Sequence, residues 1–352
     1  MFKKNMRTHS EFIKFLTEKF LNHSKTNLLF CEGIKDGFYG TIPEISNKFD
    51  SQCFELPCSE NASVGMVLGA ASYGLNPIIC FQRVEFALLA LEQLVNNSSK
   101  ISYLTNNKRT NPLLLRLVIG RGWGQGPSHS QSLETIFAQI PNINVVLPVF
   151  PEDSKLIFET FPTMKSPTIC LEHRWIHFNK NSEIKPKALE PYVIKKGNDL
   201  TIVSCGYDVV QSLMVAKIFE KYQISIEVMN FFCITPNNYS SVYDSLKKTK
   251  KLITIDINNH FYGASSELLA QIYCSGIILD IPPVRLGAKT KFSPSSRHLV
   301  DNYFINLKDI TLAVFKVIEL EAKTKDRILR EINVIDKKLP NDVPNKGFSG
   351  PF

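Results

Sequence analysis

The sequence of 352 residues lacks a long apolar run, and none of its runs approaches the roughly 20 residues that a membrane-spanning helix requires. The basic N-terminal stretch MFKKNMRTHSEFIKF has no continuous apolar segment behind it, so we expect no secretory signal. Glu11 and Glu18 also come early for an organelle transit peptide. We therefore expect a protein without membrane association that stays in the cytoplasm.

The sequence also lacks a C-x-x-C motif, although it has eight cysteines. Most of them stand inside apolar segments such as LLFCE and PIICF, where a free cysteine behaves as a small buried hydrophobic residue. This pattern argues against a disulfide scaffold and a structural zinc site, and it favours a reducing compartment. The two histidines of HRWIH (173–177) follow a predicted strand without a Glu-x-x-His pattern, so we predict no metal site.

The net charge of +8 is not gathered into a nucleic-acid-binding motif. The sequence has no zinc finger, no RNA-binding signature and no aromatic–basic repeat, and we expect no nucleic-acid partner. The lysines are scattered, with short clusters such as the one at 247–251. Such a distribution fits a solvated surface or contact with an acidic partner subunit.

The sequence does contain an alternation of strand-length apolar runs and helix-period segments. The predicted strands lie at 28–32, 78–81, 113–119, 145–147 and 168–171. The predicted helices between them lie at 65–73, 86–95 and 152–161. Continuous apolar strands are typical of parallel sheets buried on both faces. The order therefore predicts an α/β fold, with a parallel sheet between two layers of helices.

A second α/β unit follows a polar segment at 181–192, which loses the periodicity and gains Lys, Pro and Glu. Its predicted strands lie at 200–204, 224–229 and 252–257, and its predicted helices at 209–221, 239–248, 264–273 and 308–330. We therefore predict a first domain over 1–180, a linker over 181–192, a second domain over 193–320, and a charged helix end with a C-terminal tail over 321–352.

The segment LPCSENASVGMVLGAASYG places Glu60 at the start of a predicted helix that Gly74 ends. Ser59 is the predicted N-cap, and the helix dipole favours a carboxylate in the first turn. A glutamate there commonly does no more than stabilise its helix. The small residues behind it, including Gly65 and Gly69, would let another backbone or subunit approach closely. An acid at the head of such a helix suits a cofactor pocket at an interface.

The segment FQRVEFALLALEQLVNNSSK places Gln82 and Phe86 just beyond a predicted strand. Ligands of parallel α/β sheets bind at the carboxyl ends of the strands. A glutamine that hydrogen-bonds and a phenylalanine that stacks could hold a flat heterocycle there. The alternative is that Phe86 simply belongs to the core.

The glycine-rich segment GRGWGQGPSHSQS (120–132) carries His129 between two serines. Its spacing is not G-x-G-x-x-G, and the sequence has no G-x-x-x-x-G-K-[ST] loop, so neither nucleotide-binding motif is present. A histidine on a polar loop is a candidate acid or base because its pKa lies near neutrality. A solvated loop histidine is the alternative interpretation.

Together these segments resemble the β subunits of the E1 components of 2-oxoacid dehydrogenases. LPCSENASVG is similar to their T-P-[IL]-S-E-x-x-x-x-G segment, FQRVEFALLALEQLVNNSSK to their Q-x-x-x-F…D-Q-[IV]-[IV]-N helix, and HSQS to their H-S-Q loop. VLPVFPEDSK and PTICLEH resemble two further family segments, and the resemblance runs over about 28–318. It implies a transketolase-like pyrimidine-binding domain followed by a transketolase C-terminal-like domain.

The resemblance also implies a cofactor and partners. The cofactor would be thiamine diphosphate, shared with an α-type subunit in an α2β2 assembly that includes a β–β contact. The α-type signature G-D-G…N-N, which binds Mg²⁺ and the diphosphate, is absent from this sequence, so we expect Mg²⁺ in the partner. The implied activity is that of an oxidoreductase that decarboxylates a small 2-oxoacid and transfers the acyl group, active only with the partner.

By position in the family motifs, Glu60 would hydrogen-bond the N1′ atom of the aminopyrimidine ring. Cys58 would line the ring pocket where relatives usually have Ile or Leu, Phe86 would pack on the ring, and Gln82 would lie beside it. His129 would act near the substrate carboxylate or the acyl acceptor. The resemblance thus implies Glu60 and His129 as catalytic residues, and Cys58, Glu60, Gln82 and Phe86 as cofactor-binding residues.

Two departures from the family pattern leave the substrate and the acceptor open: Cys58, and Glu85, which stands where many relatives have Asp or Asn. The acceptor could be a lipoyl acyltransferase, a sugar or a carrier-protein thioester. One alternative function is a split transketolase-like enzyme, although we identify no phosphate-binding set of Arg and His. A non-catalytic regulatory paralogue is the other, and the presence of Glu60, Phe86 and His129 argues against it.

Overall fold

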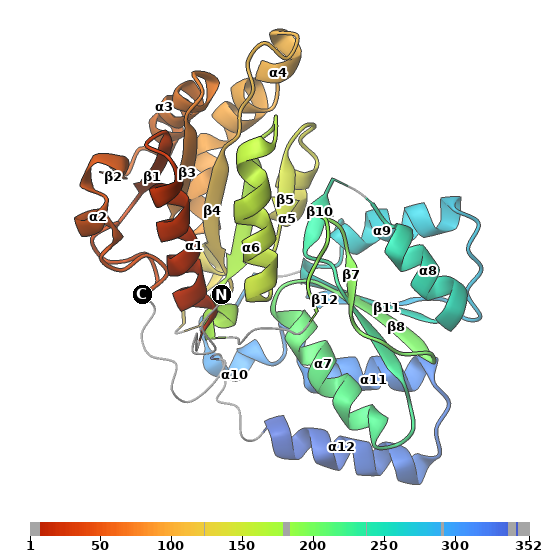
Figure 1. The fold of residues 1–352 in the computed structure, drawn as a ribbon. Helices are drawn as coiled ribbons and strands as arrows, with labels where there is room; N and C mark the ends of the chain where they lie inside the picture. The colour runs from red at the N-terminus through yellow and green to blue at the C-terminus, as the bar shows by residue number, and fades with distance from the viewer. Residues whose placement is uncertain are drawn as a thin grey trace.

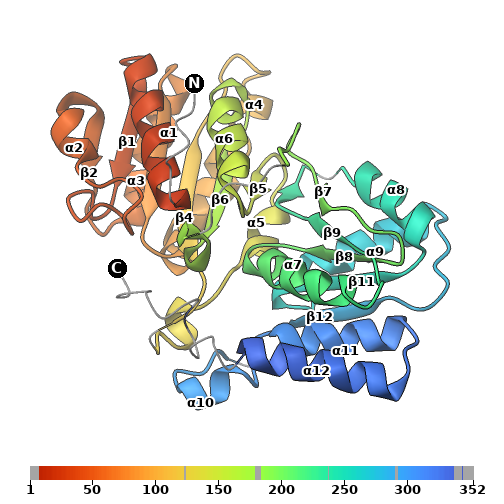
Figure 2. The same cartoon turned by 60° about the horizontal axis from the view of Figure 1, so that its bottom comes forward.

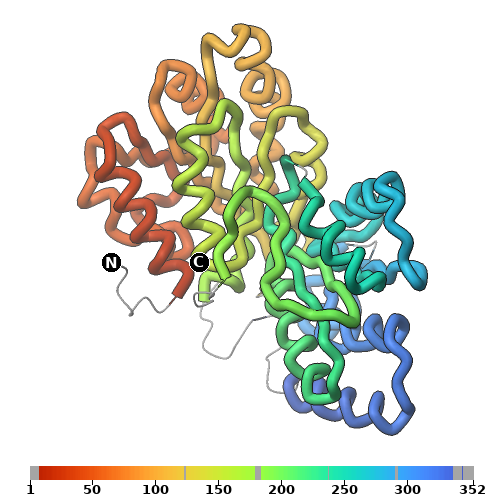
Figure 3. The backbone as a smooth tube through the Cα atoms, turned by 45° about the vertical axis from the view of Figure 1, so that its right-hand side comes forward, coloured from red at the N-terminus to blue at the C-terminus, as the bar shows by residue number. Residues whose placement is uncertain are grey.

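The computed structural model describes residues 8–122, 124–178, 184–236, 238–289, 292–336 and 343. The chain forms two α/β lobes, each built around its own sheet, and the lobes lie side by side (Figures 1 and 3). This arrangement confirms the predicted α/β fold with two mostly parallel sheets.

The first sheet has seven strands in the order β10-β5-β6-β4-β3-β1-β2. Their bounds are β1 Asn27–Cys31, β2 Cys53–Glu55, β3 Asn76–Phe81, β4 Leu114–Ile119, β5 Asn144–Val146, β6 Thr168–His173 and β10 Cys233–Thr235. All neighbours are parallel except β10, which pairs antiparallel with β5. Because β10 comes from the second half of the chain, the sheet cannot be completed by the first domain alone.

Alternate residues of these strands enter two different cores, one on each face of the sheet. On one face Leu29 and Cys31 pack with α1 (His9–His23) and α6 (Pro151–Thr160). On the other face Phe30 packs with α3 (Glu60–Ser72), the 3-10 helix η2 (Val84–Ala90), the π-helix η3 (Gln93–Ser98) and α5 (Glu134–Ala138). The sheet is therefore buried on both faces, as the continuous apolar runs predict.

The remaining short helices of this lobe lie in its connections. They are α2 (Ile45–Lys48), η1 (Asp50–Gln52), α4 (Ile101–Leu104), η4 (Pro127–His129), η5 (Phe161–Thr163) and η6 (Arg174–Phe178). The α-helix predicted at 86–95 from its periodicity is instead formed by two other helix types. The 3-10 helix η2 is wound more tightly than an α-helix, and the π-helix η3 is wound more loosely.

The second sheet has five strands in the order β12-β11-β8-β9-β7. Their bounds are β7 Tyr192–Lys195, β8 Leu200–Ser204, β9 Ile226–Asn230, β11 Leu252–Asn259 and β12 Val284–Ala288. One face packs on α7 (Tyr207–Glu220), α11 (Leu307–Val317) and α12 (Ala322–Asp336). The other packs on α8 (Ser240–Thr249) and α9 (Ala264–Cys274), and α10 (Arg297–Val300) lies in the last connection.

The single C-terminal helix predicted at 308–330 is wrong, because the chain breaks after Val317 and returns as α12. The C-cap residue Ile318 is extended, with φ −116° and ψ 123°. Figure 2 shows α11 and α12 side by side beneath the second sheet. The return places Ile328 and Ile332 in the core of this lobe, where both are fully buried. One straight helix would leave these two apolar side chains in solvent.

The N-terminal helix α1 has no counterpart among the predicted elements. Its start carries a local signal, a capping box in which Thr8 Oγ1 accepts from the Glu11 amide at 3.3 Å and Glu11 Oε2 accepts from the Thr8 amide at 3.0 Å. The T-x-x-E spacing could have revealed this helix. Among the described residues, no helix is long and apolar enough to cross a membrane.

Candidate active site

The sequence motifs meet at one edge of the first sheet. Strands β4, β3, β1 and β2 are adjacent and parallel, so their carboxyl ends open on the same side. Glu32 follows β1, Gln82 follows β3 and Gly120 follows β4, while the loop after β2 leads to Glu60. The fold thus gathers segments that are far apart in sequence at the place where parallel α/β sheets bind ligands.

Glu60 is the first residue of α3, and its side chain is buried, with 7% exposed. Ser59 occupies the N-cap position as predicted, but its side chain makes no capping hydrogen bond. The carboxylate of Glu60 is therefore the side chain that meets the positive end of the helix dipole. At the other end Gly74 has φ +89° and donates to Ala71 O at 3.0 Å, as expected for the residue that ends the helix.

A second carboxyl group, Glu32, lies beside Glu60 and was not among the predicted site residues. Its side chain is 7% exposed, and its Oε1 atom has no hydrogen-bond partner. Burial, and then the negative charge of Glu60, raise the pKa of Glu32 to about 7. Near neutral pH Glu32 is thus poised to share a proton. The only local signal for it was an acid at the end of the apolar strand LLFCE.

The raised pKa of Glu32 predicts a stability that falls as the pH rises. Folding favours its protonated form, so this stability is present below about pH 4 and is lost as the pH rises through 7. Between pH 5 and pH 8 the wild type should lose about 2 kcal/mol of unfolding free energy through Glu32. Glu32→Gln should not show this loss, because its side chain does not titrate. Urea unfolding of the isolated chain at both pH values measures it. Glu220→Gln, at an exposed position of α7, is the matched control. An equal pH dependence in wild type and Glu32→Gln would contradict the prediction.

Gln82 lies against the turn that follows β1. A Cβ atom on Gly33, whose φ is +72°, would come within 2.8 Å of Gln82 Nε2. The Glu55 carboxylate holds this turn by accepting from the amides of Gly33 at 2.7 Å and Ile34 at 3.1 Å. Gln82 therefore lies next to Glu32. Any residue larger than glycine at position 33 would displace the Gln82 side chain.

Phe86 and His129, 43 positions apart by their numbering, are in direct contact. Their ring centroids are 5.7 Å apart with an interplanar angle of 73°, an edge-to-face arrangement. Both side chains are partly exposed. Phe86 therefore does not belong to the closed core, and the two rings form one wall beside the carboxyl edge of the sheet.

The loop that carries His129 owes its glycines to backbone geometry. Gly120, Gly122, Gly124 and Gly126 have φ values of +103°, +135°, +72° and +62°, which side chains with a Cβ rarely adopt. Space is also short, because a Cβ on Gly126 would overlap the Ser295 side chain. The alternating glycines therefore allow the loop to pack closely against Ser295 of the second lobe.

Cys58 lies in the loop before α3, two positions ahead of Glu60, and its side chain is exposed. All eight cysteines of the chain are free thiols. Cys58 is one of the two that are exposed, so unlike most of the others it is available to a ligand or partner at this edge.

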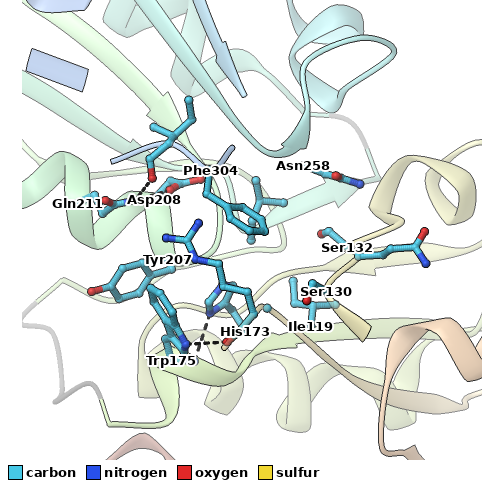
Figure 4. A pocket seen from close by; sticks show the side chains of 15 residues that line it. Ile119, Ser130, Ser132, His173, Trp175, Tyr207, Asp208, Gln211, Asn258 and Phe304 are labelled. Atoms are coloured by element: carbon cyan, nitrogen blue, oxygen red, sulfur yellow. Dashed lines mark hydrogen bonds between the residues drawn. The ribbon is translucent and has the colours of Figure 1, made fainter. Parts of the chain in front are cut away.

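The histidines of HRWIH differ in their surroundings, because His173 ends β6 at this same edge, packed against Gly120, whereas His177 lies beyond it in η6. His173 lines a cavity of about 40 Å³ between the lobes, together with Trp175, Tyr207 and Phe304 (Figure 4). It stacks on Tyr207 at 5.7 Å, and burial lowers its pKa to about 3. His177 instead faces the Glu172 carboxylate at 3.5 Å. Across the described ranges, no group of three or more His, Cys, Asp or Glu side chains is placed to hold a metal ion.

Two family models match the chain. Residues 17–176 match the transketolase pyrimidine-binding domain, and residues 191–310 match the transketolase C-terminal domain. A "pyruvate dehydrogenase E1 component subunit beta, mitochondrial" of Saccharomyces cerevisiae is 28% identical over 298 residues, which cover 81% of each chain. The beta subunit of an "acetoin:2,6-dichlorophenolindophenol oxidoreductase" of Cupriavidus necator is 26% identical, over 82% of this chain and 88% of that one.

A solved structure is similar in fold. It is titled "split gene transketolase, inactive beta4 tetramer" and superposes with a TM-score of 0.70 at 18% identity, covering 88% of this chain and 97% of the other. The match extends over both lobes, so the two-sheet arrangement described above is that of a known fold.

Proposed function

Because this chain belongs to the transketolase-like family as an E1 beta-type subunit of the 2-oxoacid dehydrogenases, we propose that the edge around Glu60 is its half of a thiamine-diphosphate site. The observation that carries the proposal is the pairing of the buried carboxyl groups of Glu60 and Glu32 with the wall of Phe86 and His129. Two carboxyl groups can exchange a proton with a ring nitrogen, and an aromatic wall can pack against a flat ring. The edge therefore suits a flat heterocycle that takes up a proton.

The chemistry of the donors fits the aminopyrimidine group. Glu60 has the polarity to accept a hydrogen bond from a ring nitrogen, and the Glu32 Oε1 atom, which is buried without a partner, can exchange a proton with it. The Phe86 ring offers a stacking surface, Gln82 an amide against the turn at Gly33, and Cys58 an exposed thiol two positions before Glu60. Thiamine diphosphate supplies the carbanion chemistry, and the protein supplies position and electrostatics.

The proposed roles of the side chains follow from their places. Glu60 holds a proton at the pyrimidine nitrogen, and Glu32 is the neighbouring acid that burial keeps largely protonated below about pH 7, its raised pKa. His129, on the partly exposed loop, moves a proton near the substrate carboxylate or the acyl acceptor. The substrate class is a small 2-oxoacid, and a lipoyl acyltransferase is one acceptor. The eight free thiols support a cytoplasmic location.

An α-type partner is proposed to complete the site in an α2β2 assembly with a β–β contact, and to bring the Mg²⁺ and the diphosphate. The surface beside Glu60 is suited to such a partner because large apolar side chains are exposed on it. They are Met66 of α3 and Leu88 and Leu89 of η2, next to Asn61, which donates to the carbonyl oxygen of Leu89. A Cβ atom on Gly69 of α3 would meet no neighbouring atom within 4 Å, so another backbone has room to pack there.

Partner dependence is the test of this proposal. The chain alone should show no decarboxylation of pyruvate with thiamine diphosphate and Mg²⁺, and adding a purified α-type chain should produce turnover. Gly69→Leu should leave the chain folded, because the position is open, and should abolish assembly and turnover. Ala270→Leu, at an exposed position of α9, is the control and should assemble normally. Substantial turnover by the isolated chain would overturn the divided site.

A further inference from the structure

A buried charged pair lies between the two ligand-facing residues Gln82 and Phe86. Arg83 is only 2% exposed, and the Glu85 side chain is 8% exposed. Arg83 Nε and Glu85 Oε2 are 3.8 Å apart. The family segment that contains Gln82 and Phe86 gives this pair no role, and Glu85 stood out in the sequence only as a departure from Asp or Asn.

Both members of the pair are bonded to the backbone of the His129 loop. Arg83 Nη2 donates to Gly120 O at 2.6 Å, where the loop leaves β4, and also to the carbonyl oxygen of His129 itself. Glu85 Oε1 accepts from the Gln131 amide at 2.8 Å. The pair thus ties the start of the glycine-rich loop to the residues at and just after His129.

The charges make these bonds stronger than neutral ones would be. Hydrogen bonds in which one partner is ionised are shorter and stronger, and the low dielectric of a buried site increases the effect. A guanidinium group buried this deeply also needs a counter-charge nearby, which Glu85 provides. The loop itself offers little stiffness, because four of its residues are glycines at positive φ.

The other side of the loop is held by Ser295 and Phe304 of the second lobe and by Trp175 of η6 in the first lobe. Gly126 packs against the Ser295 side chain, and the Arg121 guanidinium lies 3.9 Å from the centroid of the Phe304 ring and 4.8 Å from that of Trp175. These contacts hold the first part of the loop. The end that carries His129 depends on Arg83 and Glu85, which belong to the same short segment as Phe86.

We propose that Arg83 and Glu85 are positioning residues that hold His129 against Phe86 at the proposed pyrimidine site. This inference rests on the proposed function for the role of His129, while the bracing of the loop stands on the hydrogen bonds alone. Phe86 directly follows Glu85 in sequence, and the carbonyl oxygen of His129 accepts a hydrogen bond from Arg83. One charged pair therefore sets the position of both rings.

Hydrogen exchange of the isolated chain tests the bracing. Arg83→Met and Glu85→Gln should cause loss of protection in the peptide 126–132, and most of all at the Gln131 amide. Arg83→Lys and Glu85→Asp, which keep the charges, should retain part of it and cover the case in which the first variants fail to fold. Unchanged exchange in 126–132 would overturn the proposal.

Arg285→Met is the matched control for that experiment. Arg285 also donates to a main-chain carbonyl of a histidine, His260, and to Ser266 Oγ at 2.7 Å, but it does so in the second lobe. This variant should lose protection around 258–266 and keep it in 126–132. Equal loss in 126–132 for Arg285→Met would show a general loosening of the chain and would also overturn the proposal.

Rates of the assembled enzyme test the consequence for His129. His129→Ala should slow acyl transfer by about 10²-fold with little change in thiamine-diphosphate affinity. Arg83→Met should approach that loss by lowering kcat more than it raises KM, and should add little in the His129→Ala background. Losses that multiply in the double variant would overturn the proposal. A normal rate for His129→Ala would instead remove the proposed role of His129 and leave the exchange experiment to decide the bracing.

Discussion

Replacement of Glu60 by Gln in the assembled enzyme should lower the rate of thiazolium C2 proton exchange by about 10²–10⁴-fold. The glutamine keeps the size of the side chain and its place at the start of α3, but it cannot hold the charge that a protonated ring nitrogen requires. Exchange of the C2 proton, followed by NMR after an acid quench, measures this step separately from substrate binding. The stability of the chain should change little, since the position lies at the edge of the sheet.

Two comparisons sharpen the Glu60 experiment. Glu159→Gln on α6, where the side chain is 46% exposed, removes a glutamate far from the pocket and should exchange at the wild-type rate. Glu32→Gln should retain exchange but shift its pH dependence, because the pKa of Glu32 lies near 7. Wild-type exchange by Glu60→Gln would remove this residue from the proposed site, whereas loss of assembly would point to the partner surface.

The largest loss of stability is expected when a buried ion pair between two strands of the first sheet is broken. Arg116 on β4 is completely buried and donates to Glu172 on β6 through Nε at 2.6 Å and Nη2 at 2.8 Å. Nη2 also donates to Thr41 Oγ1 at 3.0 Å. The guanidinium charge is the largest favourable influence on Glu172 and holds the pKa of its carboxyl group well below the usual range, despite burial.

Glu172→Gln should therefore lower the free energy of unfolding by about 3–5 kcal/mol, because it leaves the Arg116 charge buried without its counter-ion. The double variant Arg116→Met with Glu172→Met removes both charges and should regain most of that loss. Urea unfolding of the three proteins at pH 7 measures the cycle. A double variant as unstable as Glu172→Gln would mean that shape, and not the unpaired charge, determines the cost.

The strands and their order along the chain could be predicted from local pattern. Apolar runs such as 113–119 have no polar face, which requires burial on both sides and hence a parallel sheet with helices on each face. The candidate site residues followed in the same way, since Gln82 comes directly after such a run and Glu60 heads a helix of small residues. Each of these inferences uses residues that are neighbours in sequence.

Several features depend on contacts between distant segments, and the sequence alone could not reveal them. Strand β10 has only three residues and pairs with β5, about 90 residues earlier, so no local period marks it. The break before α12 is required because Ile328 and Ile332 pack in the core of the second lobe. Arg116 looked like an interruption of an apolar strand until Glu172 was placed beside it.

The same division applies to the site around Glu60. The sequence by itself determined that an acid stands at the start of a small-residue helix and that a histidine sits on a glycine-rich loop, because both are properties of a single segment. Only the tertiary structure decided that Glu32 lies beside Glu60 and that Arg83 and Glu85 hold the His129 loop. Burial, charge interaction and hydrogen bonds across the sheet depend on distances in space, and these become fixed only when strands far apart in the chain are brought together.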